Sequence, residues 1–420
     1  MLIAGDGDIF KVLMDYEMNQ RIFLEQRTQL YWNHSGHWTP ETATLFGAYD
    51  SPTNGGKGWP IWLNTNPYIR LDWGGDSGTG EMAIMAMDYF NWVGDAQYLP
   101  LAYSVADFYM GHFNNRSEDG RVLVWPAQVL ETFWCDFNTS TASFENCCSN
   151  DAPTVSAMHA LFDKLLALPP TVTTPAQRTQ WAAFSQILPI LAVNASSNVI
   201  LPAAQVSSGR HNSEGPEFYP MHPHRMFTKG RQVASNTSIE LGISTYLQSP
   251  WRGANSGWNY ALNAAVLLGL TQQAVPMLLA RASTPPAAGY RFPGYAPHEQ
   301  DFDPSSDRKF LMGCSLSPTL PQLANLPALH TFNILVMHLD FANMNRALQE
   351  MLLQSGEDGF EDTKVVLLPA WPCAWDVHFR LVGPLNTTVE VAYVGGKVVS
   401  LTVEPPSRSS AVVWGGCMTA

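Results

Sequence analysis

Helical patterns recur along most of this sequence, and loops rich in Gly, Pro, Trp and Asn separate them. The stretch EMAIMAMDYFNWV at 81–93 is apolar on nearly every side, which predicts a buried helix. Gly94 then ends this helix and Asp95 caps the next one. The pattern predicts a mainly α chain, with helices at 8–32, 81–93, 95–113, 154–168, 175–191, 231–248, 256–270, 272–282, 322–337 and 340–355.

The last sixty residues change character. Short Val-rich runs that alternate in polarity, such as TTVEVAYV and KVVSLTVEP, are bounded by Gly-Pro and Gly-Gly turns. Gly395-Gly396 is a two-residue hairpin signal. We therefore expect a helical body over about 1–356, followed by a small antiparallel β-rich domain over about 361–420.

Composition narrows the range of functions. The chain has 420 residues, 46% of them hydrophobic, so a sizeable core is possible. Its net charge of -13 disfavours nucleic acid and anionic membranes as partners. No apolar run approaches the roughly 20 residues of a membrane span. The 14 Trp suit a protein that stacks aromatic rings on flat, hydroxylated ligands.

The N-glycosylation sequons and the cysteines indicate in which cellular compartment the protein is found. No signal peptide is visible at the start, yet six N-x-S/T sequons occur, at Asn33, Asn115, Asn138, Asn194, Asn236 and Asn386. They favour a secreted or secretory-pathway protein whose true N-terminus is missing. Of the six Cys, disulfides are most plausible among Cys135, Cys147 and Cys148; the alternative is six free, buried thiols.

Four loops combine Trp or Tyr with amides or carboxylates and with His or Arg: 32–42, 64–81, 125–134 and 214–227. A sugar site needs this mixture, because aromatic faces stack on the ring while amides and carboxylates bind the hydroxyls. The alternative is that they are ordinary helix connections. We expect the loops to converge on one cleft, with these substrate-binding residues: His37, Glu41, Asn64, Asn66, Trp73, Trp125, Trp134, Gln205, His222, His224, Arg225 and Trp258.

Hydrolysis of a glycosidic bond needs one acidic and one basic carboxyl group. Glu131 lies between Trp125 and Trp134, where burial would raise its pKa toward that of a general acid. Glu217 lies near His222, His224 and Arg225, whose charges would keep it ionised. Asp340 opens a predicted helix, where free N–H groups favour a carboxylate. The alternative for Glu131 is that it only ties its loop to a helix terminus.

Other chemistries have weaker signals. His222 and His224 have no partner motif for zinc, and the stretch 72–81 lacks the spacing of a calcium loop. The same stretch lacks the GK[ST] of a phosphate loop, and the sequence has no G-x-S-x-G elbow. We expect neither a metal nor a cofactor.

Several stretches resemble the six-hairpin glycosidases, which have an (α/α)6 barrel: GWNYALNAAVLLGL, FNWVGDAQYLPLAYSVADFY and the tail EMLLQSGEDGFEDTKVVLLPAWPCAW. The tail is similar to the junction of barrel and β-domain in glycoside hydrolase family 95, which contains α-L-fucosidases and α-L-galactosidases. A broader bacterial set shares WPAQVLET, the P-E-[LF]-Y segment at 216–219 and the W-D-V-x-F run at 375–379, and the chain is closer to that set.

The resemblance also has departures. It places the family's general acid near Gln205, which cannot donate a proton, so the acid lies elsewhere or the chain is inactive. The stretch that supplies the catalytic base in the family aligns with residues 338–341 of this sequence. Asp340 is shifted there relative to the family's aspartate. Asn64 and Asn66 resemble the amides that orient water in the family. The N-terminal β-sandwich usual in this group is absent, so we expect the sequence to be truncated at its N-terminus.

Together these features predict a glycoside hydrolase that acts on an oligo- or polysaccharide, with inversion and in the manner of an α-L-fucosidase. Glu131 is expected to be the acid and Asp340 or Glu217 the base, aided by Asn64 and Asn66. Two alternatives stay open. A polysaccharide lyase could use Tyr219, His222, His224 and Arg225, and a catalytically inactive sugar-binding protein would accord with Gln205.

Overall fold

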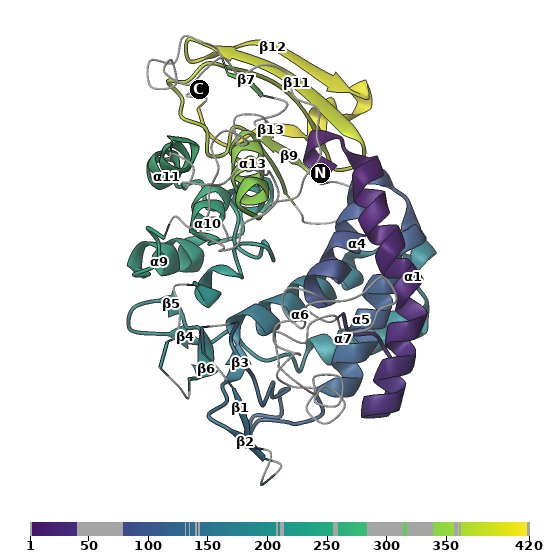
Figure 1. Cartoon of the computed structure of the whole chain (residues 1–420). Coiled ribbons are helices and arrows are strands. Elements are labelled where there is room, and N and C mark those ends of the chain that lie inside the picture. Colours follow the sequence, from purple (N-terminus) through teal and green to yellow (C-terminus); the bar gives the residue numbers. More distant parts are fainter. Residues whose placement is uncertain are drawn as a thin grey trace, which may run out of the picture. The chain divides into compact units, whose positions relative to one another are not determined.

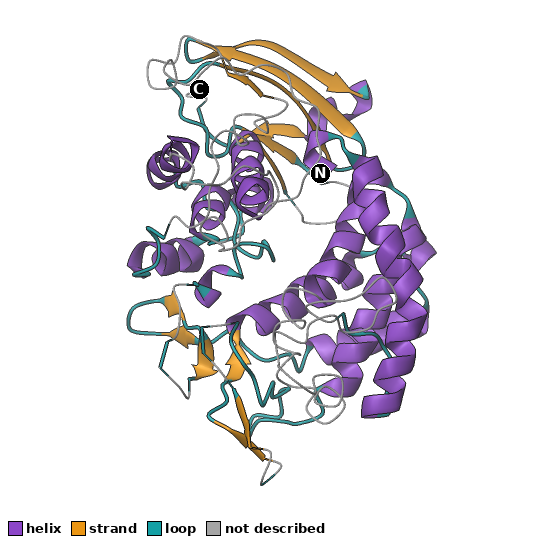
Figure 2. Cartoon of the chain, viewed as in Figure 1, coloured by secondary structure: helices purple, strands orange, loops and turns teal. Residues whose placement is uncertain are grey.

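The computed structural model describes most of the chain as helices joined by loops, with short sheets and a β-rich C-terminal region (Figure 2). The described residues are 2–39, 79–130, 132–133, 135–138, 141, 143–206, 209–210, 214–254, 259–283, 314–316, 339–356, 360 and 363–417. They form two compact units, one of residues 8–226 and one of residues 1–7 with 227–420.

In the unit 8–226, long helices pack around an apolar core (Figure 1). Its elements are α1 (Gly7–Trp32), α4 (Glu81–Val93), η3 (Ala96–Tyr98), α5 (Leu99–His112), β1 (Asp136–Asn138), β2 (Ser143–Glu145), β3 (Ser149–Asp151), α6 (Ala152–Ala167), η4 (Pro170–Val172), α7 (Pro175–Ser185), β4 (Val193–Asn194), β5 (Val199–Ile200), β6 (Ala203–Gln205) and η5 (Pro216–Phe218).

Helix α4 has the predicted bounds, and none of its residues is exposed. Gly94 ends the helix with a positive φ of 82°, which glycine adopts without strain. The Asp95 side chain then accepts the backbone N–H of Gln97 at 3.0 Å and caps η3, which leads into α5. Helix α4 packs against both α5 and α6, so its apolar character is explained by burial on several sides.

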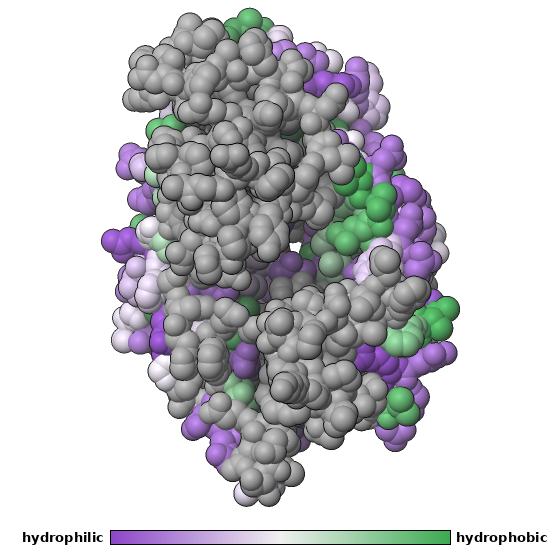
Figure 3. Space-filling view, viewed as in Figure 1, coloured by the Kyte–Doolittle hydropathy of each residue, from purple (hydrophilic) through white to green (hydrophobic). Residues whose placement is uncertain are grey.

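Helix α1 packs on this core through one side. Phe10 stacks on Tyr89 of α4 with ring centroids 5.7 Å apart, and Glu25 accepts a hydrogen bond from Ser104 of α5 at 2.7 Å. On the face drawn in Figure 3, apolar side chains lie among hydrophilic ones on the side where Figure 1 places α1. The exposed apolar residues of α1 include Val12 and Leu30, which are 71% and 75% exposed.

Glu17 gives a first prediction. It lies on the buried side of α1, and burial raises its pKa from 4.5 to about 7. The folded chain therefore holds this proton more tightly than the unfolded chain, and stability is lost as pH rises from 4.5 through 7. Glu17→Gln imitates the neutral form. At pH 8 it should raise the free energy of unfolding by about 3 kcal/mol, since one pKa unit corresponds to about 1.4 kcal/mol.

Denaturant unfolding at pH 4.5 and pH 8 measures this effect. The variant and the native chain should be nearly equal at pH 4.5. Glu118→Gln, which removes an exposed carboxylate from the same unit, is the control and should change stability little at either pH. A Glu17→Gln gain that is the same at both pH values would contradict the role of ionisation.

The described residues of the second unit form helices and two sheets. Its elements are η1 (Leu2–Ala4), α8 (Lys229–Ser235), α9 (Glu240–Gln248), α10 (Ala261–Leu267), α11 (Thr271–Ser283), β7 (Cys314–Leu316), α13 (Leu339–Leu352), β8 (Leu353–Ser355), β9 (Val365–Leu367), β10 (Val377–Gly383), β11 (Thr387–Val394), β12 (Lys397–Glu404), η6 (Pro406–Ala411) and β13 (Val412–Trp414).

The β-rich tail is confirmed. Strands β12, β11, β10 and β7 form an antiparallel sheet in that order, and β13, β9 and β8 form a second sheet in which β13 and β9 are parallel. Gly395 and Gly396 join β11 to β12 with φ values of 57° and 78°, as a two-residue hairpin requires. The buried positions of β10 and β11 alternate along each strand, so one face of this sheet packs on the core.

Several helix bounds differ from those predicted. The predicted helix 231–248 is two helices, because Asn236 takes the left-handed conformation with φ 59° and ends α8. Helix α7 ends at Ser185, ahead of Pro189, which would break a helix interior. The end of the predicted helix 340–355 is strand β8. The predicted helix 322–337 lies outside the described residues.

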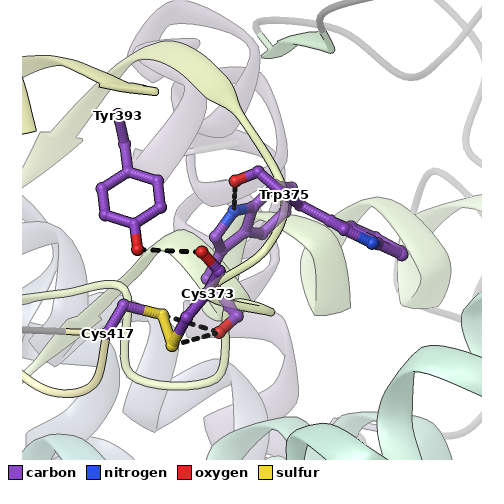
Figure 4. Close-up of a disulfide and its surroundings, with 5 residues drawn as sticks. Cys373, Trp375, Tyr393 and Cys417 are labelled. Atoms are coloured by element: carbon purple, nitrogen blue, oxygen red, sulfur yellow. Dashed lines mark hydrogen bonds between the residues drawn. A yellow bond between two sulfur atoms is a disulfide. The ribbon is translucent and has the colours of Figure 1, made fainter. Parts of the chain in front are cut away.

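Two disulfides join parts of the chain, Cys135 to Cys147 and Cys373 to Cys417. The first is among the pairs that the sequence favours, and Cys148 is buried and belongs to neither disulfide. Figure 4 shows the second, which joins the loop before β10 to the end of the described chain. Around it, the Trp371 indole donates to the Trp375 carbonyl at 2.9 Å and the Tyr393 hydroxyl donates to the Cys373 carbonyl at 3.0 Å.

Candidate functional site

The described part of the predicted site lies almost wholly in the unit 8–226. Seven predicted residues are described there: His37, Trp125, Gln205, Glu217, His222, His224 and Arg225. Asp340 belongs to the other unit, where it is the second residue of α13. Seven more lie outside the described residues: Glu41, Asn64, Asn66, Trp73, Glu131, Trp134 and Trp258. The predicted convergence of the loops on one cleft stays a prediction.

Residues 214–226 form the best-defined part of the site, a closely wound segment held by its own backbone. Phe218 donates its N–H to Gly215 at 2.8 Å, and His222 donates to Phe218 at 2.9 Å. Gly215 permits this winding, because a Cβ atom there would lie 2.5 Å from the Phe218 ring. The segment is buried: Glu217, His222 and His224 are 5%, 2% and 2% exposed.

His224 anchors this segment to α6. Its Nδ1 lies 2.7 Å from the Ser156 hydroxyl, and its ring lies 5.9 Å from that of Tyr219. The Ser156 hydroxyl also donates to the Ala152 carbonyl at 2.6 Å. Because a carbonyl only accepts, this arrangement assigns the Nδ1 proton to His224, which donates it to the Ser156 oxygen. His224 thus fixes the segment against the first turns of α6.

Arg225 faces α4. Its Nη1 lies 4.0 Å from Asp88 Oδ2, and Lys164 of α6 binds the other Asp88 oxygen at 3.0 Å. Arg225 has a positive φ of 54°, which is uncommon for a side chain of this size. Sequence reasoning expects Arg225 among the cations that act on Glu217. The structure gives Arg225 a carboxylate partner on α4.

The cation that the structure pairs with Glu217 is Arg210. Arg210 Nη2 lies 4.0 Å from Glu217 Oε2, and the same nitrogen donates to the Glu214 carbonyl. The guanidinium lies 5.7 Å from the centre of the Phe133 ring, and Thr132 donates its hydroxyl to Glu214 at 3.2 Å. We call Arg210, Glu214, Glu217, Thr132 and Phe133 the Arg210 cluster.

The Arg210 cluster joins two parts of the chain: Arg210 and Glu214, which precede Glu217, contact Phe133 and Thr132. Thr132 and Phe133 directly follow Glu131 in the sequence. Burial lowers the pKa of Arg210, and the charges of Glu217 and Glu214 oppose that change. Sequence reasoning missed Arg210. Its only signal is the position of an Arg seven residues before Glu217, in a loop that otherwise carries mostly small and polar residues.

Gln205 lies in β6, where it is exposed and pairs with Ser149 of β3. Two residues further along β3, Asp151 caps α6 by accepting the Thr154 N–H at 2.8 Å. Burial raises the pKa of Asp151 to about 6. Asp151, the carboxylate of this strand pair, is thus a buried helix cap. Its position is explained by the stabilisation of α6.

His37 and Trp125 have contrasting surroundings. Trp125 is 42% exposed, as a side chain that stacks on a ligand requires. His37 is fully buried, and burial lowers its pKa to about 3, with a further contribution from Arg21. It lies in the loop after α1, whose His34 Nε2 is 3.0 Å from His112 Nδ1 of α5.

Buried histidines make the unit 8–226 sensitive to acid. Burial lowers the pKa of His112, like that of His37, to about 3, while an unfolded histidine has a pKa near 6.5. The unfolded chain therefore binds more protons, and stability falls as pH drops from 6.5 toward 3. His112→Gln removes one such group. Its free energy of unfolding should fall less between pH 7 and pH 5 than that of the native chain, by about 2 kcal/mol.

Denaturant unfolding at the two pH values measures this difference. His378→Gln is the control for loss of one imidazole, because that side chain is 56% exposed. An unchanged loss of stability between pH 7 and pH 5 in His112→Gln would contradict the assignment.

The described residues also bear on metal ions and membranes. Among them, no group of three or more His, Cys, Asp or Glu side chains is arranged to hold a metal ion. No helix of the described chain has both the length and the apolar character needed to cross a membrane.

The fold is similar to that of a solved structure named "Putative kojibiose phosphorylase from human microbiome". The TM-score is 0.52 at 10% sequence identity, over 94% of this chain and 53% of that one. The chain thus spans about half the length of that protein. This similarity concerns the fold and does not single out family 95. No family model matches the sequence, and no curated protein matches it.

Proposed function

We propose that this chain is a carbohydrate-active enzyme that cleaves a glycosidic bond by hydrolysis. The observation that carries the assignment to carbohydrate-active enzymes is the fold similarity to the protein named "Putative kojibiose phosphorylase from human microbiome"; hydrolysis rests on the sequence resemblance to glycosidases. The burial of Glu217 beside Arg210 supports it, because a reactive carboxylate needs a fixed, partly desolvated position. Exposed Trp125 supports a saccharide partner.

The proposal includes an architecture and roles. An (α/α)6 barrel over 1–356 is followed by a β-domain over 361–420. Glu131 protonates the leaving oxygen, while Glu217 or Asp340 removes a proton from the attacking water that Asn64 and Asn66 orient. The reaction inverts the anomeric centre, and the preferred substrate resembles an α-L-fucoside. These assignments rest on the sequence resemblance and on the need for two carboxyl groups in different environments.

Phosphorolysis is the second candidate, and the name of the similar solved protein favours it. In that reaction inorganic phosphate replaces water as the nucleophile, so the product is a sugar 1-phosphate. The two reactions share the acid that protonates the leaving oxygen, and they differ in whether a base must activate the nucleophile.

The test is an assay of the purified chain on 4-nitrophenyl α-L-fucoside, α-L-galactoside and α-glucoside and on kojibiose, with and without phosphate. Free sugar independent of phosphate supports hydrolysis, and phosphate-dependent sugar 1-phosphate supports phosphorolysis. A uronate polysaccharide added in parallel tests for a lyase, whose new double bond absorbs ultraviolet light. Trp fluorescence that responds to sugar without any product would instead indicate an inactive binder.

A secretory-pathway location is part of the proposal. Two disulfides are typical of oxidising compartments. Five of the six sequon asparagines have described side chains, and all five are exposed: Asn33, Asn115, Asn194, Asn236 and Asn386. Expression through the secretory pathway of a eukaryotic cell, followed by peptide N-glycosidase, should reduce the mass of the chain. A mass unchanged by the enzyme would count against N-glycosylation.

A further inference from the structure

Arg210 has contacts that link the two loops on which the proposed chemistry depends. It lies 4.0 Å from Glu217, donates to the carbonyl of Glu214, and faces the ring of Phe133, two residues after Glu131. Its side chain is 22% exposed and that of Glu217 is 7% exposed. Solvent therefore screens the attraction between these two charges much less than it screens a surface ion pair.

We propose that Arg210 is a positioning residue that holds Glu217 ionised and fixes it beside Thr132 and Phe133. The inference rests on the proposed function and adds to it, because it assigns Glu217 to the base. An opposite charge within about 4–6 Å favours the ionised form of a carboxyl group. Arg210 also contacts the Phe133 ring, so the same side chain links Glu217 to Phe133.

The other charged groups around Glu217 bear on this balance. Glu214 is a like charge that disfavours ionisation of Glu217, and Arg210 faces both carboxylates. Helix α6 packs against η5, and α6 and its cap carry further ionisable groups: Asp151, His159, Asp163 and Lys164. Lys164 is engaged with Asp88, and Asp151 with the start of α6. Among the described residues, Arg210 is thus a cation in contact with Glu217, at 4.0 Å.

The experiment compares kcat/KM against pH for the native chain, Arg210→Met and Arg210→Lys. If Arg210 holds Glu217 ionised, its removal raises the pKa of the base, so the acidic limb of the profile should move up by about one to two pH units. Arg210→Lys keeps the charge and should restore most of the native profile. Arg178→Met is the matched control, because that arginine of the same unit donates to the carbonyls of Leu166 and Leu168, and the acidic limb of this variant should stay in place.

A second measurement needs no turnover. The effect of Glu217→Gln on the free energy of unfolding is measured from pH 4 to pH 8, first in the native background and then in the background of Arg210→Met. With Arg210 present, Glu217→Gln should cost more stability as pH rises from 4, because the variant loses a paired carboxylate; in the Arg210→Met background this rise should vanish or reverse, because a buried carboxyl group without its cation favours the protonated form. Arg210→Gln replaces Arg210→Met if the latter does not fold.

These results separate the inference from the proposed function. A native chain that turns over no glycoside, combined with an Arg210-dependent titration of Glu217, would overturn the function and leave the electrostatic role intact. An active native chain whose acidic limb and Glu217 titration are both unmoved by Arg210→Met would overturn the inference. A loss of activity at every pH without such a shift would show that Arg210 is only structural.

Discussion

Replacing Glu131 by Gln should lower turnover of an unactivated glycoside by roughly 10²–10⁴-fold, the usual contribution of general acid catalysis. Gln cannot supply a proton to the leaving oxygen, although it keeps the size of the side chain. Glu131 is flanked by Trp125 and Trp134 in sequence, and desolvation is an effective way to keep a carboxyl group protonated near neutral pH. Steady-state kinetics on an alkyl or saccharide glycoside measure the loss.

A glycoside with an activated leaving group provides the internal comparison. A 2,4-dinitrophenolate leaves without protonation, so Glu131→Gln should largely spare this substrate. Glu145→Gln removes an exposed carboxylate near the same stretch of chain and should leave both rates nearly native. Equal loss on both substrates would indicate that Glu131 has a structural or binding role, such as tying its loop to a helix terminus.

Replacing Glu217 by Gln should also lower hydrolysis by roughly 10²–10⁴-fold, but equally on activated and unactivated glycosides. The physical reason is that a base acts on the attacking water and is needed whatever the leaving group. Glu217 is buried and paired with Arg210, so the substitution also removes a charge that the cluster neutralises. Thermal unfolding of the variant therefore accompanies the kinetics.

Added azide distinguishes the base from other roles of Glu217. Azide needs no deprotonation, so it should restore turnover of the activated glycoside by Glu217→Gln and give a glycosyl azide. Glu214→Gln is the control within the same cluster and should be neither strongly impaired nor responsive to azide. Sparing of the activated substrate in Glu217→Gln would instead assign Glu217 to the acid.

Much of the local structure was accessible from the sequence. The apolar run at 81–93, with Gly94 and Asp95 after it, contains its own end signals, and the observed helix has the predicted bounds. The alternating strands and the Gly395-Gly396 turn likewise define a hairpin without reference to the rest of the chain. The predicted helix 231–248 was wrong because of a single residue: Asn236 adopts a left-handed conformation that a helical pattern does not reveal.

The candidate site was predictable in its residue types but not in its pairings. The sequence identified the segment around Glu217, and neighbouring residues suggested that His222, His224 and Arg225 act on it. In the structure, His224 contacts Ser156 of α6, 68 positions away, and Arg225 contacts an aspartate of α4. Glu217 is paired with Arg210. Helix packing decides such pairs, because it sets which distant side chains are buried together.

The mainly α body, the β-rich tail and the chemical character of the loops can therefore be read from local patterns, since periodicity, caps and turns act over a few residues. The burial of Glu217, its pairing with Arg210 and the burial of His37 came from the three-dimensional arrangement. Burial and the partners of a charge depend on which helices pack together, and those contacts join residues far apart along the chain.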